Sequence, residues 1–295
     1  MERWSFRIVD VFSQRPLAGN QLAVFEDATS VPESLLQPLA REIGYSETVF
    51  AYPGRNGADQ QIRIFTPTSE IPFAGHPVLG TAVVVATNTG ADRVVLETGR
   101  GLVPVRIDRT TGPAMRGTME QPIPSYELYD KGDEFLRALG VHRSLLPVTI
   151  YDNGLTHVYA MLERAADVAA VSPDLSALSE LAHSSRLPLM GFNVFSGSGL
   201  TWKTRMFAPA DDIAEDPATG SAAGPLALHL ARHGRIPWET EIRIAQGAEI
   251  GRPSELFARV SGNADHVTRI EVSGYAFPVG GGWFEGELLR SRGTA

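Results

Sequence analysis

The chain repeats a short motif at an offset close to half its length, and this repeat limits the fold more than any other feature. Arg63-Ile64-Phe65-Thr66-Pro67 in the first half matches Arg205-Met206-Phe207-Ala208-Pro209 in the second half. At the same offset, Arg7-Ile8-Val9-Asp10 matches Thr149-Ile150-Tyr151-Asp152. Matches that keep both order and offset indicate a duplicated unit, whereas chance similarity between short strands would rarely keep them. The sequence therefore predicts two lobes of similar topology.

The segment Gln121-Pro122-Ile123-Pro124 separates the two halves. We predict an N-terminal lobe at residues 1–124 and a C-terminal lobe at residues 125–295, whose last strand is able to return to the first lobe. Short runs rich in Val, Ile, Phe and Tyr, bounded by turn residues, predict strands in both lobes. Helices are fewer: Ser30 to Glu33 has the form of a capping box, and Gly44 is the expected end of that helix.

One helix in each half is predicted to be central. The segments Pro77 to Ala86 and Ser221 to Ala231 are apolar on nearly all sides, so each must be buried on every side. Small residues such as Gly80 and Gly224 let a surrounding sheet approach closely. We therefore predict an α+β fold of two similar lobes, each a curved, mostly antiparallel sheet wrapped around a central helix, with the active site in the cleft between them.

Composition removes several classes of function. The 295-residue chain contains no cysteine, which excludes disulfides, thiolate nucleophiles and cysteine-based zinc sites. Its formal net charge of −8 is spread along the sequence, which argues against nucleic acid or a membrane surface as a partner. The first ten residues contain no apolar stretch of signal-peptide or membrane-spanning length. We expect a cytoplasmic protein.

The starts of the two central helices are candidate anion sites. A helix start offers unpaired backbone donors and the positive end of the helix dipole. Ala74-Gly75-His76-Pro77 provides one such start, and Ala218-Thr219-Gly220-Ser221 provides the other and adds two hydroxyls. Plain helix capping without a ligand is the alternative. Glycine at both starts favours a site for a small carboxylate, because a ligand can approach the backbone closely there.

Two acidic residues stand beside these helix starts. Glu47 enters an apolar strand next to the hydroxyl of Ser46, and Asp216 comes shortly before the second helix. Alone, each is more often a solvated strand-end acid or an acid that stabilises a helix start through the dipole. Taken as a pair, one from each lobe, they suit general acid–base catalysis.

The sequence gives little support to a metal or an organic cofactor. His229 and His233 are four residues apart on a helix, but no third ligand is evident, and interaction with the carboxyl end of the helix is the favoured interpretation. Lys203 lies in a strand-like segment without a phosphate-binding glycine pattern, which disfavours pyridoxal phosphate. The turn Ser196-Gly197-Ser198-Gly199 lacks the third glycine of a dinucleotide fingerprint. We predict no metal and no cofactor.

Several segments together resemble the phenazine-biosynthesis PhzF isomerases, a family with the diaminopimelate-epimerase-like fold. The resemblance covers nearly the whole chain. Its most specific segments are Val9-Asp10-Val11-Phe12 through Gly19-Asn20, Ser46-Glu47-Thr48-Val49-Phe50, Pro72-Phe73-Ala74-Gly75-His76-Pro77, and Glu215-Asp216-Pro217-Ala218-Thr219-Gly220-Ser221. Further segments, including Gln246-Gly247-Ala248-Glu249, resemble the phenazine-forming members in particular.

The resemblance implies a cofactor-independent isomerase that converts trans-2,3-dihydro-3-hydroxyanthranilate to an amino-oxo-cyclohexene carboxylate, and a homodimer. It implies that Glu47 is the acid–base group that moves a proton between ring carbons on one face. The substrate-binding residues that it implies are Ser46, Gly75, His76, Asp216, Gly220 and Ser221.

Two alternatives remain beside this function. One is a related epimerase or isomerase of another small amino or hydroxy acid, and the other is a binding protein of the same fold without activity. The stretch around Asn153-Gly154 differs from the phenazine-forming members, which bears on the ring substituents that the site accepts. The carboxylate of Glu47 argues against a pure binding protein, since a carboxylate adds little to an anion-binding site. Related epimerases use two cysteines as their bases, and this chain has none.

Overall fold

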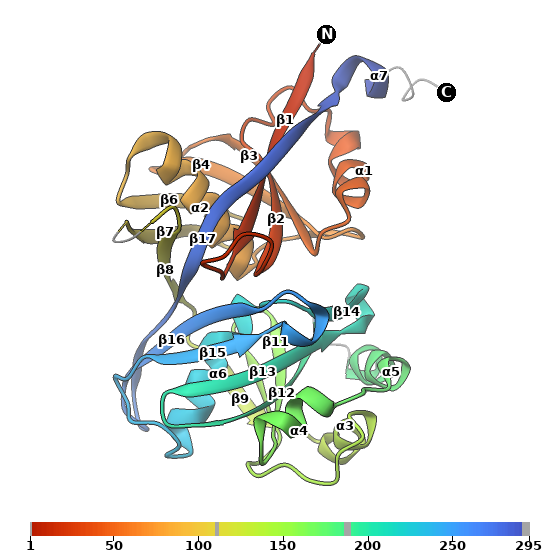
Figure 1. The fold of residues 1–295 in the computed structure, drawn as a ribbon, viewed down its shortest axis with the longest axis vertical. Coiled ribbons are helices and arrows are strands. Elements are labelled where there is room, and N and C mark those ends of the chain that lie inside the picture. The colour runs from red at the N-terminus through yellow and green to blue at the C-terminus, as the bar shows by residue number, and fades with distance from the viewer. Residues whose placement is uncertain (1, 110–111, 186–189, 291–295) are drawn as a thin grey trace. The chain divides into compact units, whose positions relative to one another are not determined.

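The computed structural model describes residues 2–109, 112–185 and 190–290. The chain divides into two compact units: unit 1 comprises Met1–Met119 and Gly274–Ala295, and unit 2 comprises Glu120–Ser273. Figure 1 shows the elements of both. The boundary expected after residue 124 falls inside unit 2. No helix among the described residues is long and apolar enough to cross a membrane.

Unit 1 is a curved sheet around one long helix, with a second helix beside it (Figure 1). Its elements are β1 (Arg3–Val11), β2 (Asn20–Phe25), α1 (Glu33–Ile43), β3 (Glu47–Pro53), β4 (Gln60–Phe65), β5 (Glu70–Ile71), α2 (Gly75–Thr89), β6 (Arg93–Thr98), β7 (Gly101–Asp108) and β8 (Met115–Gln121), together with the end of β17 (Val267–Glu285) and α7 (Gly286–Arg290). β17 pairs antiparallel with β1 along the whole of β1.

Unit 2 repeats this plan with extra helices on one side (Figure 1). Its elements are β9 (Ser125–Leu128), α3 (Gly132–Ala138), β10 (Thr149–Asp152), β11 (Thr156–Met161), α4 (Ala165–Ala170), α5 (Leu175–Ser185), β12 (Met190–Ser198), β13 (Thr201–Ala208), β14 (Ile213–Asp216), α6 (Gly220–Arg232), β15 (Ile242–Gln246) and β16 (Ser254–Gly262), with two short 3₁₀ turns, η1 (Pro209–Asp211) and η2 (Ala248–Ile250).

The strand pairings follow the same order in the two units. β1 pairs antiparallel with β2, β2 parallel with β3, and β3 antiparallel with β4; β4 then pairs antiparallel with β5 and parallel with β6, which pairs antiparallel with β7. β10, β11, β12, β13, β14, β15 and β16 repeat these pairings in the same order. This shared pattern of parallel and antiparallel neighbours is what a duplicated unit predicts.

The repeated arginine motif carries the same ion pair in each unit. Nε and Nη2 of Arg63 on β4 donate to the two carboxylate oxygens of Glu70 on β5, at 2.7 and 2.6 Å. Nε and Nη2 of Arg205 on β13 donate to the two carboxylate oxygens of Glu215 on β14, at 2.9 and 2.7 Å. The motif found in the sequence therefore marks equivalent strands, each joined by a bidentate arginine–carboxylate pair to the short strand that follows it.

The two central helices are buried as expected. In α2 every residue from Gly75 to Ala86 is buried, and in α6 every residue from Gly220 to Ala231. α2 contacts β1, β2, β3, β6 and β7. A Cβ atom added at Gly80 would lie 2.7 Å from side-chain carbons of Leu22 and Val11. Glycine there lets the sheet close on the helix, which agrees with the role predicted for it.

The first predicted helix ends as expected but begins differently. Gly44 follows α1 with a left-handed φ of 71°, and its N–H donates to the carbonyl of Ala40. Pro32, however, is the residue that precedes α1, and no side chain caps the helix start. The capping box predicted at Ser30 to Glu33 is therefore wrong. The helix begins two residues later than that pattern requires, with Pro32 at the N-cap and Glu33 as its first residue.

Candidate active site

In unit 1 the structure places Glu47 beside His76. Glu47 is the first residue of β3, and its side chain is 13% exposed. His76 is the second residue of α2, and its side chain is 4% exposed. Oε2 of Glu47 lies 3.4 Å from Nδ1 of His76. Two residues predicted from separate motifs thus form one acid–base pair at the start of the central helix.

The environment of Glu47 brings the pKa of its carboxyl close to neutral pH. Burial raises the pKa of Glu47 from 4.5 to about 7, and a hydrogen bond with Ser46 offsets part of this rise. At neutral pH the protonated and ionised forms therefore coexist. A group with its pKa near the working pH is best placed to serve first as a base and then as an acid.

Asn20 contacts both Ser46 and His76. The Ser46 hydroxyl lies 3.0 Å from Oδ1 of Asn20, and Nδ2 of Asn20 lies 3.4 Å from Nδ1 of His76. Nε2 of His76 lies 3.3 Å from the carbonyl of Gln21, and it must donate there because a carbonyl only accepts. In the neutral ring Nδ1 of His76 is then the unprotonated nitrogen, which accepts from the Asn20 amide, so a hydrogen bond with Glu47 needs the proton on the carboxyl.

In unit 2 the structure places Asp216 at the end of β14 and joins it to the start of α6. The Thr219 hydroxyl donates to Oδ2 of Asp216 at 2.6 Å. Gln246, at the end of β15, donates through Nε2 to the carbonyl of Asp216 at 2.8 Å and accepts the N–H of Thr219 at 3.2 Å. The hydroxyl of Thr219, expected at the anion site, is thus directed at Asp216. Thr219 and Gln246 hold this carboxylate in place, a role that sequence reasoning missed.

Gly220 and Ser221 form the first turn of α6, and both are buried. No side chain caps this helix start. The Ser221 hydroxyl lies 3.0 Å from Nε2 of His157. In unit 1, Gly75 begins α2 after Ala74, again without a side-chain cap. At the start of α6 the N–H of Thr219 bonds to Gln246 and that of Ala222 to the carbonyl of Thr219, so the predicted anion site there depends on the N–H groups of Gly220 and Ser221.

Three side chains support the carbonyl groups of the first turn of α6. Pro225 lies inside this helix and has no N–H to donate to the carbonyl of Ser221, four residues earlier. Nδ2 of Asn153 donates to that carbonyl instead, at 2.9 Å. Gln121 donates to the carbonyl of Gly220 at 2.8 Å, and the Tyr159 hydroxyl donates to that of Ala222 at 2.7 Å. Asn153, in the loop that is expected to differ from the phenazine-forming members, thus supports the helix start.

The histidines near the end of α6 do not behave as the sequence suggested. His229 is fully buried, and its Nδ1 lies 3.0 Å from the Tyr151 hydroxyl. Burial is the main cause that lowers the pKa of His229 to about 3. The predicted interaction with the helix end is wrong for His229, because its ring lies among the rings of Tyr151, Tyr159 and Phe195. Among the residues that the structure describes, no cluster of three or more His, Cys, Asp or Glu is placed to hold a metal ion.

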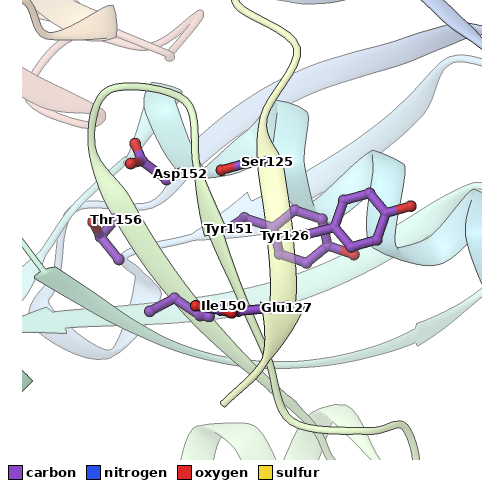
Figure 2. A pocket seen from close by; sticks show the side chains of 7 residues that line it. All are labelled: Ser125, Tyr126, Glu127, Ile150, Tyr151, Asp152 and Thr156. Carbon is purple, nitrogen blue, oxygen red and sulfur yellow. The ribbon is translucent and has the colours of Figure 1, made fainter.

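A separate cavity of about 240 Å³ lies in unit 2 on β9, β10 and the start of β11. Figure 2 shows its lining: Ser125, Tyr126, Glu127, Ile150, Tyr151, Asp152 and Thr156. None of these residues was predicted to belong to a site. The cavity shares no residue with the group formed by Asp216, Thr219, Gln246 and the start of α6.

A family model described as phenazine biosynthesis-like protein matches residues 9–282. The chain belongs to this family. It is 46% identical to the trans-2,3-dihydro-3-hydroxyanthranilate isomerase of Pseudomonas chlororaphis, over 93% of this chain and 97% of that one. The isomerase of the same name from Pseudomonas aeruginosa is 45% identical over 90% of this chain and 94% of its own length.

Solved structures give the same fold. The phenazine biosynthesis protein of Bacillus anthracis has a TM-score of 0.85 at 22% identity and covers 97% of this chain and 100% of its own. A predicted epimerase from Pseudomonas aeruginosa has a TM-score of 0.80 at 28% identity and covers 95% and 98%. A hydroxyproline epimerase from Agrobacterium vitis, with a TM-score of 0.62 at 12% identity, covers 95% and 92%. The fold predicted from the resemblance is confirmed.

The raised pKa of Glu47 suits catalysis near neutral pH, but it also predicts that the fold loses stability as the carboxyl ionises. A carboxyl whose pKa is higher in the folded state stabilises the fold while it is protonated, and this stability is lost as the pH rises from 4.5 to about 7. The shift corresponds to about 3 kcal/mol. Relative to wild type, Glu47→Gln should therefore gain up to about 3 kcal/mol in free energy of unfolding between about pH 4 and pH 8.

Urea unfolding at a series of pH values measures this gain. Glu42→Gln is the matched control, because Glu42 is an exposed carboxyl on α1 of the same unit. Its difference from wild type should stay constant with pH. A Glu47→Gln difference that is equally constant would contradict the assigned shift.

Proposed function

We propose that this protein is an isomerase of phenazine biosynthesis that converts trans-2,3-dihydro-3-hydroxyanthranilate into an amino-oxo-cyclohexene carboxylate. The observation that carries the reaction type is the buried carboxyl of Glu47, whose pKa is about 7 and which lies 3.4 Å from His76. The names of the relatives at 45–46% identity support the substrate. Identity at this level over nearly the whole of both chains is expected of enzymes that catalyse the same reaction.

In the proposed reaction Glu47 is both base and acid. The ionised carboxylate removes the proton from the hydroxyl-bearing ring carbon, and the electron pair of that C–H bond moves into the conjugated ring. The protonated carboxyl then returns the proton to another ring carbon on the same face. The enol left at the hydroxyl-bearing carbon tautomerises to the oxo group. Substrate and product are isomers, so the reaction needs no oxidant, reductant, metal or organic cofactor.

The binding groups in the proposal are those that the family resemblance implies. In unit 1, His76 and Ser46 bind the polar edge of the substrate, and the backbone at Gly75 offers donors to its oxygens. In unit 2, Asp216 binds the amino group, and Gly220 and Ser221 bind the carboxylate. Uncapped helix starts support these roles, since their N–H groups and the helix dipole favour anions. We also propose that the protein is cytoplasmic and forms a homodimer; the family resemblance favours the homodimer.

The test is turnover of trans-2,3-dihydro-3-hydroxyanthranilate by purified protein in heavy water containing a chelator, followed by NMR of the ring protons. We expect consumption of the substrate and partial retention of the original hydrogen at the new carbon, because a buried carboxyl exchanges its proton slowly with water. Complete wash-in of deuterium would instead indicate a two-base route. No consumption of this substrate, together with turnover of another amino or hydroxy acid, would overturn the assignment.

A further inference from the structure

A buried histidine lies behind the serine that is proposed to bind the substrate carboxylate. His157 is on β11 and is 2% exposed. Its Nε2 lies 3.0 Å from the hydroxyl oxygen of Ser221. Sequence reasoning gave His157 no role. Its contact with Ser221 has two possible directions, because a neutral imidazole has one N–H, and a hydroxyl can either donate or accept.

Asn193 on β12 determines which nitrogen of His157 carries the proton. Its Nδ2 lies 3.2 Å from the carbonyl of Val158 and 3.3 Å from that of Gly191. Carbonyls only accept, so the amide nitrogen of Asn193 must face them. The same nitrogen lies 3.5 Å from Nδ1 of His157. Two N–H groups cannot face each other at that distance, so Nδ1 is the unprotonated nitrogen and Nε2 carries the hydrogen.

The ring of His157 is held in this state by packing and by burial. A Cβ atom added at Gly191 would lie 2.7 Å from Nδ1 of His157, so glycine at this position of β12 lets the ring pack against the strand. Burial lowers the pKa of His157 to about 3, which keeps the ring neutral at any ordinary working pH. Nε2–H of His157 therefore donates to Ser221, and the oxygen of Ser221 accepts.

This direction fixes what Ser221 can offer a ligand. One lone pair of its oxygen is occupied by His157, and its own hydrogen is directed away from that ring. The hydroxyl then acts as a donor at the first turn of α6. A carboxylate can only accept, so a serine held as a donor suits it, whereas a serine that donated to His157 would present lone pairs to the anion.

We propose that His157 is a positioning residue that holds the Ser221 hydroxyl as a hydrogen-bond donor to the substrate carboxylate. The proposal deepens the function proposed above and rests on it for the identity of the substrate. The direction of the His157–Ser221 hydrogen bond does not depend on that function, so the two can fail separately.

The first experiment measures the tautomer without any ligand. Long-range ¹H–¹⁵N correlation spectra of labelled protein distinguish a protonated from an unprotonated imidazole nitrogen, and the His157→Phe spectrum assigns the signals. We expect His157 to be neutral with the hydrogen on Nε2 between about pH 6 and about pH 8. A hydrogen on Nδ1, or a charged ring, would overturn the proposal, because Ser221 would then not be held as a donor.

The second experiment is a double-mutant cycle. Calorimetry measures the binding of anthranilate, an aromatic amino-carboxylate, and turnover of the proposed substrate is measured in parallel. We expect His157→Phe and Ser221→Ala each to raise Kd and KM about tenfold with little change in kcat, the loss of one hydrogen bond to a charged group. The double variant should be no weaker than Ser221→Ala alone. His157→Gln, whose amide N–H can replace Nε2–H, should stay within about threefold of wild type.

Effects that multiply to about 100-fold in the double variant would show that His157 acts without Ser221 and would overturn the proposal. Thermal unfolding checks the fold of each variant. If His157→Phe does not fold, His157→Asn replaces it in the cycle, because its shorter amide cannot reach Ser221. If wild type binds anthranilate but does not turn over the proposed substrate, the proposed function is rejected. The double-mutant cycle on anthranilate binding then still tests the role of His157.

Discussion

Glu47→Gln is expected to lower kcat by about 10³-fold or more, near the upper part of the range for loss of a general acid–base group. The amide has nearly the shape of the carboxyl but can neither take nor return a proton. The polar partners of Glu47, Ser46 and His76, can still contact the amide, so substrate binding should change little. Steady-state kinetics on trans-2,3-dihydro-3-hydroxyanthranilate measure kcat and KM separately.

Asp216→Asn is the matched comparison, because it makes the same chemical change at the carboxylate proposed to bind the amino group. It should raise KM more than it lowers kcat. In wild type, kcat/KM should increase with pH until Glu47 is ionised, above about pH 7. A Glu47→Gln enzyme with near-normal kcat would show that another group moves the proton. The kcat of Asp216→Asn would then indicate whether that group is Asp216.

The parts of the fold that the sequence predicted are those with a local signal. α2 and α6 are apolar on all sides, and only a buried position tolerates such a helix. The arginine motif recurs because the same strand, with the same ion pair to the next strand, occurs twice. Asp216 was predicted because it is an acid shortly before the glycine that begins a helix, and Glu47 because it is an acid that enters an apolar strand next to Ser46. Each of these signals is confined to a few residues.

The parts that were missed depend on which strands become neighbours. Asn20 reaches Ser46 because β2 pairs parallel with β3, with Leu22 opposite Glu47. Nothing near Asn20 in the sequence indicates this register. His157 and Ser221, on β11 and α6, are 64 residues apart in sequence, further than Asn20 and Ser46, which are 26 apart. The error at His229 has the same origin, since only the tertiary structure places its ring against Tyr151.

The duplicated arginine provides a stability prediction with its own internal control. Arg205 is 7% exposed, and besides its pair with Glu215 its Nη1 donates to the carbonyls of Val168, Ala169 and Val171, at 3.2, 3.2 and 2.7 Å. The carbonyls lie at the end of α4, where that of Val168 also accepts the N–H of Val171 at 3.3 Å. Arg205→Met should lower the free energy of unfolding by about 3–5 kcal/mol, because it leaves the carboxylate of Glu215 buried without its partner.

Arg63→Met makes the same change in the equivalent strand of unit 1, where the setting differs. The side chain of Arg63 is 25% exposed, and its two partners Glu70 and Glu33 are 43% and 75% exposed. Water can solvate those carboxylates when the arginine is lost, so the cost should stay near or below about 1 kcal/mol. Urea unfolding, with hydrogen exchange to show which unit opens, compares the two variants. Equal costs would contradict the view that burial decides the difference.

A third variant separates the two roles of Arg205. If the unpaired carboxylate causes most of the loss, Arg205→Met combined with Glu215→Leu should recover much of it, since an apolar pair can replace a buried ion pair at little cost. If the carbonyls at the end of α4 cause the loss instead, the double variant should stay as unstable as Arg205→Met, and hydrogen exchange should increase first in α4. We expect recovery to be partial, because three carbonyl contacts are lost in either case while the buried charge is removed only in the double variant.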